Sequence, residues 1–239
     1  MKIVLLGLNK IGDKVLEYLK SLNQDELYLI TKKEELKKVK EIQPNIILSV
    51  GFRHIVPKEI VSIPPLGAIN LHKSLLPLNR GANPVIWTII NKTKAGVTIH
   101  YMDEGIDTGD IIAQREVNVS FSDNAKDLYQ KLEKVQYSLF REMWPAIRKG
   151  DARGISQCGQ PSYHVMNDFK KVRSINPEQK MRIIDFVNYL RAMTFPPFCN
   201  AYIEKNEKKY FIEINVKEEQ PLICNEDKPF LKQYGFVND

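Results

Sequence analysis

The chain has 239 residues, of which 43% are hydrophobic, and carries a formal net charge of +6. This length suffices for a substantial core and predicts one or two domains. We find no apolar run of about eighteen residues, and the first apolar segment is too short and too strand-like for a signal peptide. We therefore expect a cytoplasmic protein with no membrane partner.

Cysteine spacing and charge patterning exclude further classes. Cys158, Cys199 and Cys224 lie far apart, an odd number without disulfide or zinc spacing, so we expect free thiols and no metal. The densest lysine run, residues 32–41, interleaves acidic and apolar residues, which is typical of a solvated amphipathic helix. We expect no nucleic-acid partner, although the positive charge would help to collect a substrate that carries phosphates.

Apolar runs alternate with helical segments in the first third of the chain. The runs are residues 3–6, 27–30, 46–50 and 68–71, and residues 14–22 form the clearest helix between them. This alternation predicts an α/β, Rossmann-like fold with a mostly parallel sheet and helices on both faces. Gly7 and Gly12 frame the first turn but have neither dinucleotide-site nor P-loop spacing, so we interpret them as a turn only.

Three polar side chains follow in positions that bring them together. Asn70 and His72 are two residues apart at the end of the fourth run, so both leave the same face of a strand at its carboxyl end. Open α/β sheets hold their ligands at that edge. Asp107 lies in the loop between two further predicted strands, residues 96–101 and 111–117. The sequence therefore predicts one pocket with an amide, an imidazole and a carboxylate.

These three groups suit formyl transfer from a folate to an amine. When the amine attacks the formyl carbon, the carbonyl oxygen becomes an oxyanion that the Asn70 amide and a His72 N–H can stabilise. The amine must also lose a proton, and an imidazole oriented by a carboxylate can accept it near neutral pH. We predict Asn70, His72 and Asp107 as the catalytic residues.

The same stretch resembles a known family. NLHKSLLP at residues 70–77, Arg80-Gly81, and GVTIHYMDEGIDTGD at residues 96–110 resemble the catalytic domain of the 10-formyltetrahydrofolate-dependent formyltransferases. The resemblance covers roughly residues 1–165 and implies 10-formyltetrahydrofolate as the formyl donor. It also implies that the pterin ring meets the loop at residues 51–56 and the wall at residues 102–107. The predicted donor contacts are His54, Val56, Met102, Glu104 and Asp107.

The rest of the chain predicts two domains, residues 1–165 and 166–239. Residues 84–90 form a short helix, and a longer one runs from about Asp123 to Gly150. The small C-terminal region has a helix with Asn176 as N-cap, then a β-hairpin of residues 201–204 and 210–216, then a polar tail. One side of the hairpin is an apolar row that would be exposed alone, and the resemblance implies a homodimer interface there. The row consists of Tyr210, Ile212, Ile214 and Val216.

Three acceptors compete within the resemblance. The first loop, residues 8–11, lacks the small residues with which the glycinamide ribonucleotide enzyme holds a phosphate. Residues 166–239 offer no full barrel of the kind that the methionyl-tRNA enzyme carries. NRGANPVIW at residues 79–87 and LRAMTFPPF at residues 190–198 resemble the sugar N-formyltransferases. The resemblance thus implies a nucleotide-linked amino-dideoxysugar, most simply a dTDP sugar for a cell-surface polysaccharide such as lipopolysaccharide O-antigen.

The predicted substrate contacts are Ser74, Arg80 and Asn83. Arg80 could bind a phosphate with two hydrogen bonds or could form a salt bridge that pins its loop. We expect Trp87 in the core rather than as a platform for a base. Three alternatives stay open: a methionyl-tRNA formyltransferase-like enzyme, a hydrolase of 10-formyltetrahydrofolate, and a non-catalytic module that binds folate or a nucleotide sugar.

Overall fold

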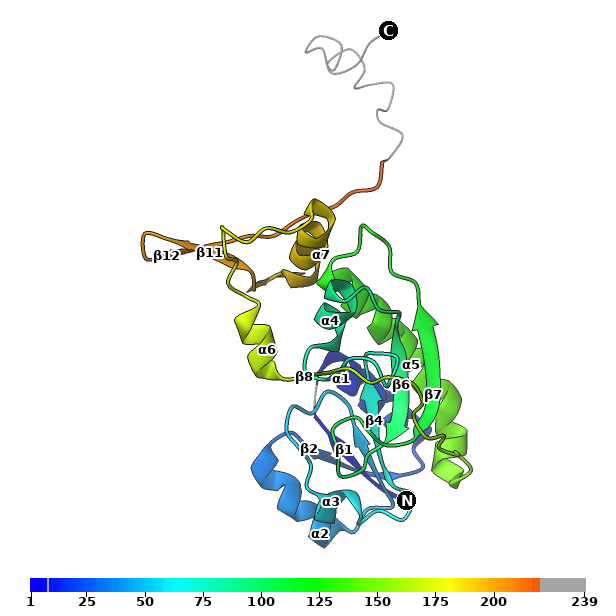
Figure 1. Ribbon diagram of the computed structural model, residues 1–239. Coiled ribbons are helices and arrows are strands. Elements are labelled where there is room, and N and C mark those ends of the chain that lie inside the picture. Colours follow the sequence, from blue (N-terminus) through cyan, green and yellow to red (C-terminus); the bar gives the residue numbers. More distant parts are fainter. Residues whose placement is uncertain (8, 220–239) are drawn as a thin grey trace, which may run out of the picture.

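The computed structural model describes residues 1–7 and 9–219. Its centre is a six-stranded sheet with the strand order β2-β1-β3-β4-β6-β7, which Figure 1 shows with helices packed around it. The four strands on one side are parallel, and β6 and β7 are antiparallel to their neighbours, which confirms the predicted mostly parallel sheet. The strands are β1 (Lys2–Leu6), β2 (Glu26–Ile30), β3 (Ile46–Ser49), β4 (Ala68–His72), β6 (Ala95–Tyr101) and β7 (Ile111–Val117).

Two hydrophobic cores lie on opposite faces of this sheet. Helices α1 (Lys10–Leu22), α4 (Pro84–Ile90) and α5 (Ala125–Lys149) contribute to the larger core. The smaller core lies under the 3₁₀ helix η1 (Lys33–Lys38) and the short helices α2 (Val39–Ile42) and α3 (Lys58–Val61). The helices on both faces confirm the predicted architecture.

The lysine-rich segment is helical but not one α-helix, because it begins with the 3₁₀ turns of η1. Its two buried residues, Leu36 and Val39, are three apart, a spacing that a 3₁₀ turn keeps on one face.

The alternation along β4 places the candidate site. Ile69 and Leu71 point into the larger core, whereas Ala68 belongs to the smaller one. Asn70 and His72 share the face of Ala68, because successive side chains of a strand alternate. They leave that face where β4 ends, as predicted.

The longest helix has clear signals at both ends. The Asn124 side chain accepts hydrogen bonds from the backbone of Lys126 and Asp127, and the Asp127 side chain completes a capping box. Gly150 ends the helix with φ 79°, a conformation that glycine adopts at little cost. The predicted end at Gly150 is confirmed, and the start lies two residues after the predicted Asp123.

After α5 the chain runs back across the end of the sheet (Figure 1). Strand β8 (Tyr163–His164) pairs there with β5 (Arg80–Gly81). The chain then forms α6 (Met166–Lys171), α7 (Ile183–Met193), β9 (Thr194–Phe195), β10 (Phe198–Cys199), β11 (Tyr202–Lys205) and β12 (Lys208–Phe211).

Two predictions for the C-terminal region were wrong. Helix α7 begins at Ile183 and not next to Asn176, whose side chain caps only a turn at Glu178, because residues 178–182 are exposed and have no core to cover. The hairpin turn is Asn206-Glu207, both with positive φ, so β12 ends at Phe211 instead of Val216. Ile212 and Ile214 then pack against the larger core of the same chain.

Arg191, within the segment at residues 190–198, joins α7 to the loop that precedes α5. Its guanidinium is buried and donates to the carbonyl oxygens of Ser120 and Asp123 and to the side chain of Asn188. Cys158 and Cys199 are exposed free thiols, whereas Cys224 and the predicted polar tail lie outside the described residues. Within residues 1–7 and 9–219, no helix combines the length and the hydropathy needed to cross a membrane.

Candidate active site

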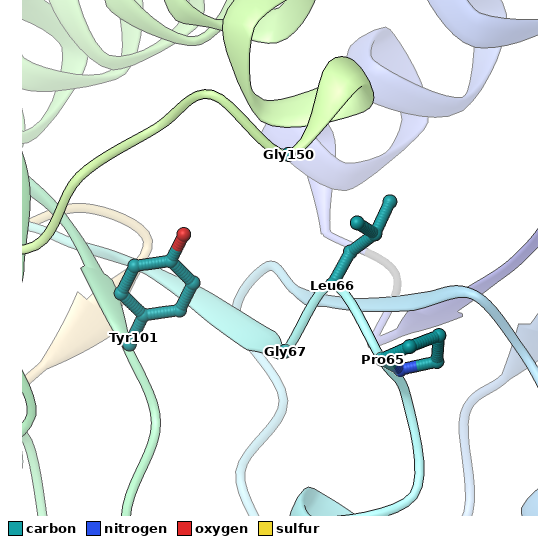
Figure 2. Close-up of a pocket in the computed structure, with 5 residues that line it drawn as sticks. All are labelled: Pro65, Leu66, Gly67, Tyr101 and Gly150. Atoms are coloured by element: carbon teal, nitrogen blue, oxygen red, sulfur yellow. The ribbon is translucent and has the colours of Figure 1, made fainter.

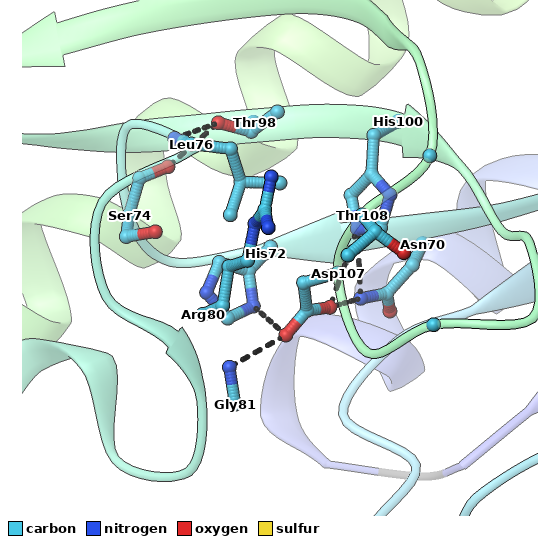
Figure 3. Close-up of polar contacts among 12 residues, drawn as sticks. Asn70, His72, Ser74, Leu76, Arg80, Gly81, Thr98, His100, Asp107 and Thr108 are labelled. Carbon is cyan, nitrogen blue, oxygen red and sulfur yellow. Dashed lines mark hydrogen bonds and ion pairs between the residues drawn. The ribbon is translucent and has the colours of Figure 1, made fainter. Parts of the chain in front are cut away.

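The structure brings Asn70, His72 and Asp107 together around one carboxylate (Figure 3). Asp107 Oδ1 accepts a hydrogen bond of 3.0 Å from Asn70 Nδ2, and Oδ2 accepts one of 2.8 Å from the Gly81 amide. His72 Nδ1 lies 3.5 Å from Oδ2. Only 11% of the Asp107 side chain is exposed. The predicted amide, imidazole and carboxylate therefore form a single polar cluster.

The hydrogen bonds of His72 define which ring nitrogen can take a proton. Nε2 lies 3.0 Å from the carbonyl oxygen of Asn79, which can only accept, so Nε2 carries a hydrogen. The neutral ring then has its lone pair on Nδ1, the atom that faces Asp107. A proton accepted at Nδ1 would form an ion pair with that carboxylate.

His100 is a member of this cluster that the sequence prediction missed. Its Nδ1 donates to the Tyr101 carbonyl oxygen at 2.7 Å, so its Nε2 can accept a hydrogen bond from Asn70 Nδ2 at 3.2 Å. Both hydrogens of the Asn70 amide are thereby engaged, one by His100 and one by Asp107. His100 lies in the quoted motif at residues 96–110, and only its pairing opposite Asn70 in the sheet shows its role.

The electrostatics of the pair favour a neutral imidazole beside an ionised carboxylate. Burial lowers the pKa of His72, and the Asp107 charge opposes this shift in part. Burial would raise the pKa of Asp107, but the positive charges that His72 and His100 carry when protonated, together with the Gly81 amide, hold it well below its usual range. His72 is therefore able to act as a base at neutral pH, next to a group that stabilises its protonated form.

Gly81 holds the carboxylate through its main chain. It has φ 86°, and a Cβ atom there would lie 2.3 Å from the His164 carbonyl oxygen. Only glycine combines this positive φ with the absence of a Cβ atom. Strand β8 can therefore lie close to Gly81 and hold it in position. The return of the chain after α5 thus fixes the donor to Asp107 Oδ2.

The predicted substrate contacts have different surroundings. The buried Ser74 hydroxyl donates to the Leu78 carbonyl oxygen at 2.6 Å and so holds the turn that leads to Arg80. Arg80 binds Gln157 instead of a carboxylate. Asn83 is half-buried, with its amide 3.7 Å from the sulfur of Met166. Their contacts with a substrate stay predictions. Trp87 is buried, as predicted, and its ring stacks on His164.

The predicted donor contacts lie along one side of the smaller core. Val56 is buried there, and Phe52 and Met102 pack against that core. His54 is exposed and meets the Phe52 ring edge-on. A cleft of about 370 Å³ is lined by Met102 and Glu104, and Glu104 forms an ion pair across it with Lys58.

A second cleft, of about 300 Å³, adjoins the first at the start of β4, where the side chains of Leu66 and Tyr101 lie on either side of Gly67 (Figure 2). Neither of these two clefts is lined by Asn70, His72 or Asp107.

Lys73 points away from His72, toward α5. Its Nζ lies 4.5 Å from the centre of the Tyr129 ring. Burial lowers the pKa of Lys73 to about 8, and the Glu133 charge opposes this shift. The end of β4 therefore carries an ionisable group on each face of the sheet.

Comparison with known proteins gives this arrangement a family. The formyl transferase family model matches residues 9–143, which is more than half of the chain and includes Asn70, His72 and Asp107. The chain belongs to the formyl transferase family. Residues 168–218 match a second model, the N-formyltransferase dimerization C-terminal domain.

Relatives of both predicted kinds are similar to this formyl transferase. A methionyl-tRNA formyltransferase from Clostridioides difficile is 40% identical over 178 residues, covering 73% of this chain and 56% of its own length. The chain thus spans little more than half of that relative.

Two solved structures are also similar. The formyltransferase PseJ from Anoxybacillus kamchatkensis, in complex with UDP-4,6-dideoxy-4-formamido-L-AltNAc and tetrahydrofolate, is 40% identical with a TM-score of 0.66, over 72% of this chain and 89% of its own. A 4-N formyltransferase from Francisella tularensis is 27% identical with a TM-score of 0.80, over 91% of this chain and 98% of its own.

Proposed function

We propose that this protein transfers a formyl group from 10-formyltetrahydrofolate to the amine of a nucleotide-linked amino-deoxysugar. The observation that carries the proposal is the cluster in which Asp107 is held by Asn70 and Gly81 and faces His72 Nδ1. The similarity to PseJ, whose complex contains a nucleotide-linked formamido sugar, supports an acceptor of this class.

In the proposed reaction His72 is the general base. The incoming amine donates a proton to Nδ1, because Nε2 keeps its hydrogen on the Asn79 carbonyl oxygen. The resulting imidazolium lies beside the Asp107 carboxylate, 3.5 Å away before the transfer. The same proton can later leave with the folate nitrogen as the carbon–nitrogen bond breaks. Asp107 stays ionised in this proposal, because the N–H groups of Asn70 and Gly81 bind its carboxylate before and after the transfer.

Asn70 stabilises the oxygen of the formyl group in this proposal. Its amide hydrogens bind Asp107 at 3.0 Å and His100 at 3.2 Å. The neutral His100 nitrogen is the weaker acceptor, so we expect that hydrogen to move to the developing oxyanion while the bond to Asp107 is kept. Asp107 thus orients both the base and the oxyanion donor.

The residues along the smaller core fit a reduced folate. Phe52 and Met102 offer apolar contact for a flat ring, and Glu104 offers a polar edge in a cleft of about 370 Å³. His54 and the backbone of Val56 complete the proposed contacts. The folate supplies the formyl carbon. In this proposal these residues hold the folate next to the loop that carries Asp107.

Arg80 is the proposed contact for the diphosphate of the acceptor. The residue is half-buried, and the described residues give its guanidinium the neutral partner Gln157, so its charge is left for an anion. We propose a dTDP-linked 3-amino or 4-amino dideoxyhexose as the acceptor, with a UDP-linked sugar as the next to test because PseJ holds one.

A second acceptor has its own support. The relative from Clostridioides difficile, at 40% identity, is a methionyl-tRNA formyltransferase. The chemistry at Asn70, His72 and Asp107 would serve either amine.

An acceptor panel distinguishes these functions. Purified protein is incubated with 10-formyltetrahydrofolate and with dTDP-linked or UDP-linked amino sugars, methionyl-tRNA or buffer, and both tetrahydrofolate release and the mass of the product are followed. We expect formylated sugar and no tetrahydrofolate without an acceptor. Formylation of methionyl-tRNA alone would show that the tRNA, and not a nucleotide sugar, is the acceptor. Formate release without an acceptor would indicate a hydrolase.

We also propose a homodimer formed through the C-terminal hairpin. Tyr210 and Phe211 are about half exposed, and residues 168–218 match the dimerization domain model. The predicted row is shorter than expected, because Ile212 and Ile214 pack on their own chain. Light scattering at micromolar concentration should give twice the mass of one chain, and Phe211→Glu should reduce it. A monomer at all concentrations would exclude this interface.

A further inference from the structure

The chain between α5 and α6 crosses the candidate site as a segment that we call the return segment, residues 155–164. Ile155 exchanges two backbone hydrogen bonds with Ile111 at its start. At its end β8 pairs with β5, and the His164 carbonyl oxygen accepts from the Ala82 amide. Most of the segment is exposed, but Gln157 is turned inward among exposed neighbours.

The Gln157 side chain uses its full hydrogen-bonding capacity. Nε2 donates to the carbonyl oxygens of Asp107 at 2.9 Å and Gly109 at 2.8 Å. Oε1 accepts from Arg80 Nε at 3.2 Å and from a terminal Arg80 nitrogen at 2.7 Å. A carboxamide has two N–H hydrogens and two oxygen lone pairs, so all four are engaged.

The two carbonyl groups belong to a loop that needs external support. Asp107 has φ 55°, in the left-handed region where a residue with a side chain is strained. Gly109 is packed so closely that a Cβ atom would lie 2.0 Å from the Tyr101 carbonyl oxygen. Such a conformation persists only when its surroundings hold it. Gln157 supplies two of those bonds to the main chain of the loop.

The other half of the carboxamide holds Arg80. The described part of the chain gives Arg80 no ion pair, and Gln157 is a neutral acceptor. One side chain therefore connects the proposed contact for the acceptor diphosphate to the loop that carries Asp107.

We infer that Gln157 is a positioning residue for formyl transfer, which holds the Asp107 carboxylate in line with His72 and aims Arg80 at the acceptor. The expected effect on turnover rests on the proposed function, whereas the expected effect on the structure of the Asp107 loop does not. The structural consequence is that loss of the two Gln157 donors loosens the Asp107 loop and exposes the Gly81 amide, which binds Asp107 Oδ2.

Three variants test this. Gln157→Ala removes all four bonds, and Gln157→Glu keeps an acceptor for Arg80 but loses both donors to the loop. Gln160→Ala changes an exposed glutamine of the same segment and serves as the matched control. For each variant we would measure kcat, KM for donor and acceptor, the pH dependence of kcat, and the hydrogen exchange rate of the Gly81 amide.

We expect Gln157→Ala and Gln157→Glu to lower kcat by about 10-fold to 100-fold, the scale of a misplaced catalytic group, with the donor KM unchanged. Gly81 should exchange faster in both variants than in the control, and the acid limb of kcat should move to lower pH, because Asp107 then supports His72 less. The acceptor KM should rise in both variants, because Gln157→Ala leaves Arg80 without its partner and Gln157→Glu places a negative charge on Arg80 that competes with the acceptor diphosphate.

Three results would overturn the inference. These are a Gln157→Ala enzyme as active as the control, a Gln157→Glu enzyme as active as the wild type, and a loss of activity with unchanged Gly81 exchange and an unchanged pH profile. If the wild type formylates no acceptor, the proposed function fails, and the Gly81 exchange rates still decide whether Gln157 holds the loop.

Discussion

The Gly81 amide nitrogen lies 2.8 Å from Oδ2 of Asp107, the same oxygen that faces His72 Nδ1. A main-chain donor held by the pairing of β5 with β8 therefore orients the carboxylate. The orientation of the Asp107 side chain therefore depends on the backbone of Gly81, a residue that has no functional side chain of its own.

Replacing this glycine tests that dependence. In Gly81→Ala the new Cβ would lie 2.3 Å from the His164 carbonyl oxygen, so β8 must move and the donor to Asp107 must shift. We expect kcat to fall by about tenfold or more while the protein stays folded. Gly159→Ala is the control, because Gly159 also has a positive φ but has nothing within 4 Å of its Cβ position. Equal effects of the two changes on kcat would contradict this role for Gly81.

Removing the imidazole should abolish the chemistry and spare the fold. His72→Ala deletes the proposed base and the donor to the Asn79 carbonyl oxygen. We expect kcat to fall about 100-fold or more, the scale of a lost general base, with circular dichroism unchanged. Near wild-type turnover in this variant would exclude His72 as the base.

The pH dependence of kcat should report the His72 ring. Burial lowers its pKa below the ordinary 6.5, so the active neutral form prevails at neutral pH and kcat should fall only in more acidic solution. In Asp107→Asn the negative charge that favours the imidazolium is gone, so the acid limb of the residual activity should move to still lower pH. Movement of that limb to higher pH would show that another group is being titrated.

Lys73 should make stability depend on pH above neutrality. Its pKa is about 8 in the folded protein against 10.5 for an ordinary lysine, so between these values the unfolded chain binds more protons and the free energy of unfolding rises with pH. The gain is at most about 3.5 kcal/mol, since the two pKa values differ by about 2.5 and each pKa unit is worth about 1.4 kcal/mol.

Urea unfolding of the wild type and of Lys73→Met gives their free energies of unfolding at pH 7 and pH 10. The gain is the change, between the two pH values, in the difference between the two proteins. Lys134→Met, at an exposed position of α5, is the control and should show no such change.

The regular part of the fold was predictable because its signals are local. Apolar runs separated by helical segments predicted the parallel strands and both helix layers, and Gly150 marked the end of α5. The start of α7 was not predictable, because Asn176 has the side chain of an N-cap but the residues directly after it are exposed and bury no apolar surface. The second strand of the hairpin was placed too late, because two residues with positive φ, Asn206 and Glu207, form a tighter turn than the polar run suggested.

The site was predictable only in part. Asn70 and His72 share a face of one strand, and the motif that contains Asp107 comes with them in the sequence. His100 joins the cluster through the antiparallel pairing of β6 with β4, and Gln157 reaches it from fifty residues further along the chain. Neither contact has a local signal, because both depend on how distant segments lie in the folded protein.

The path of the return segment limits how the protein can be recombined. For a chimera that exchanges the C-terminal region for that of a relative, the obvious junction is Gly150, where α5 ends. Such a junction would take Gln157 and the partner of β5 from the foreign sequence. A junction after His164 keeps every native contact of Asp107 described above. The useful boundary for such an exchange is therefore the end of the return segment, which is hydrogen-bonded to the site, and not the end of α5.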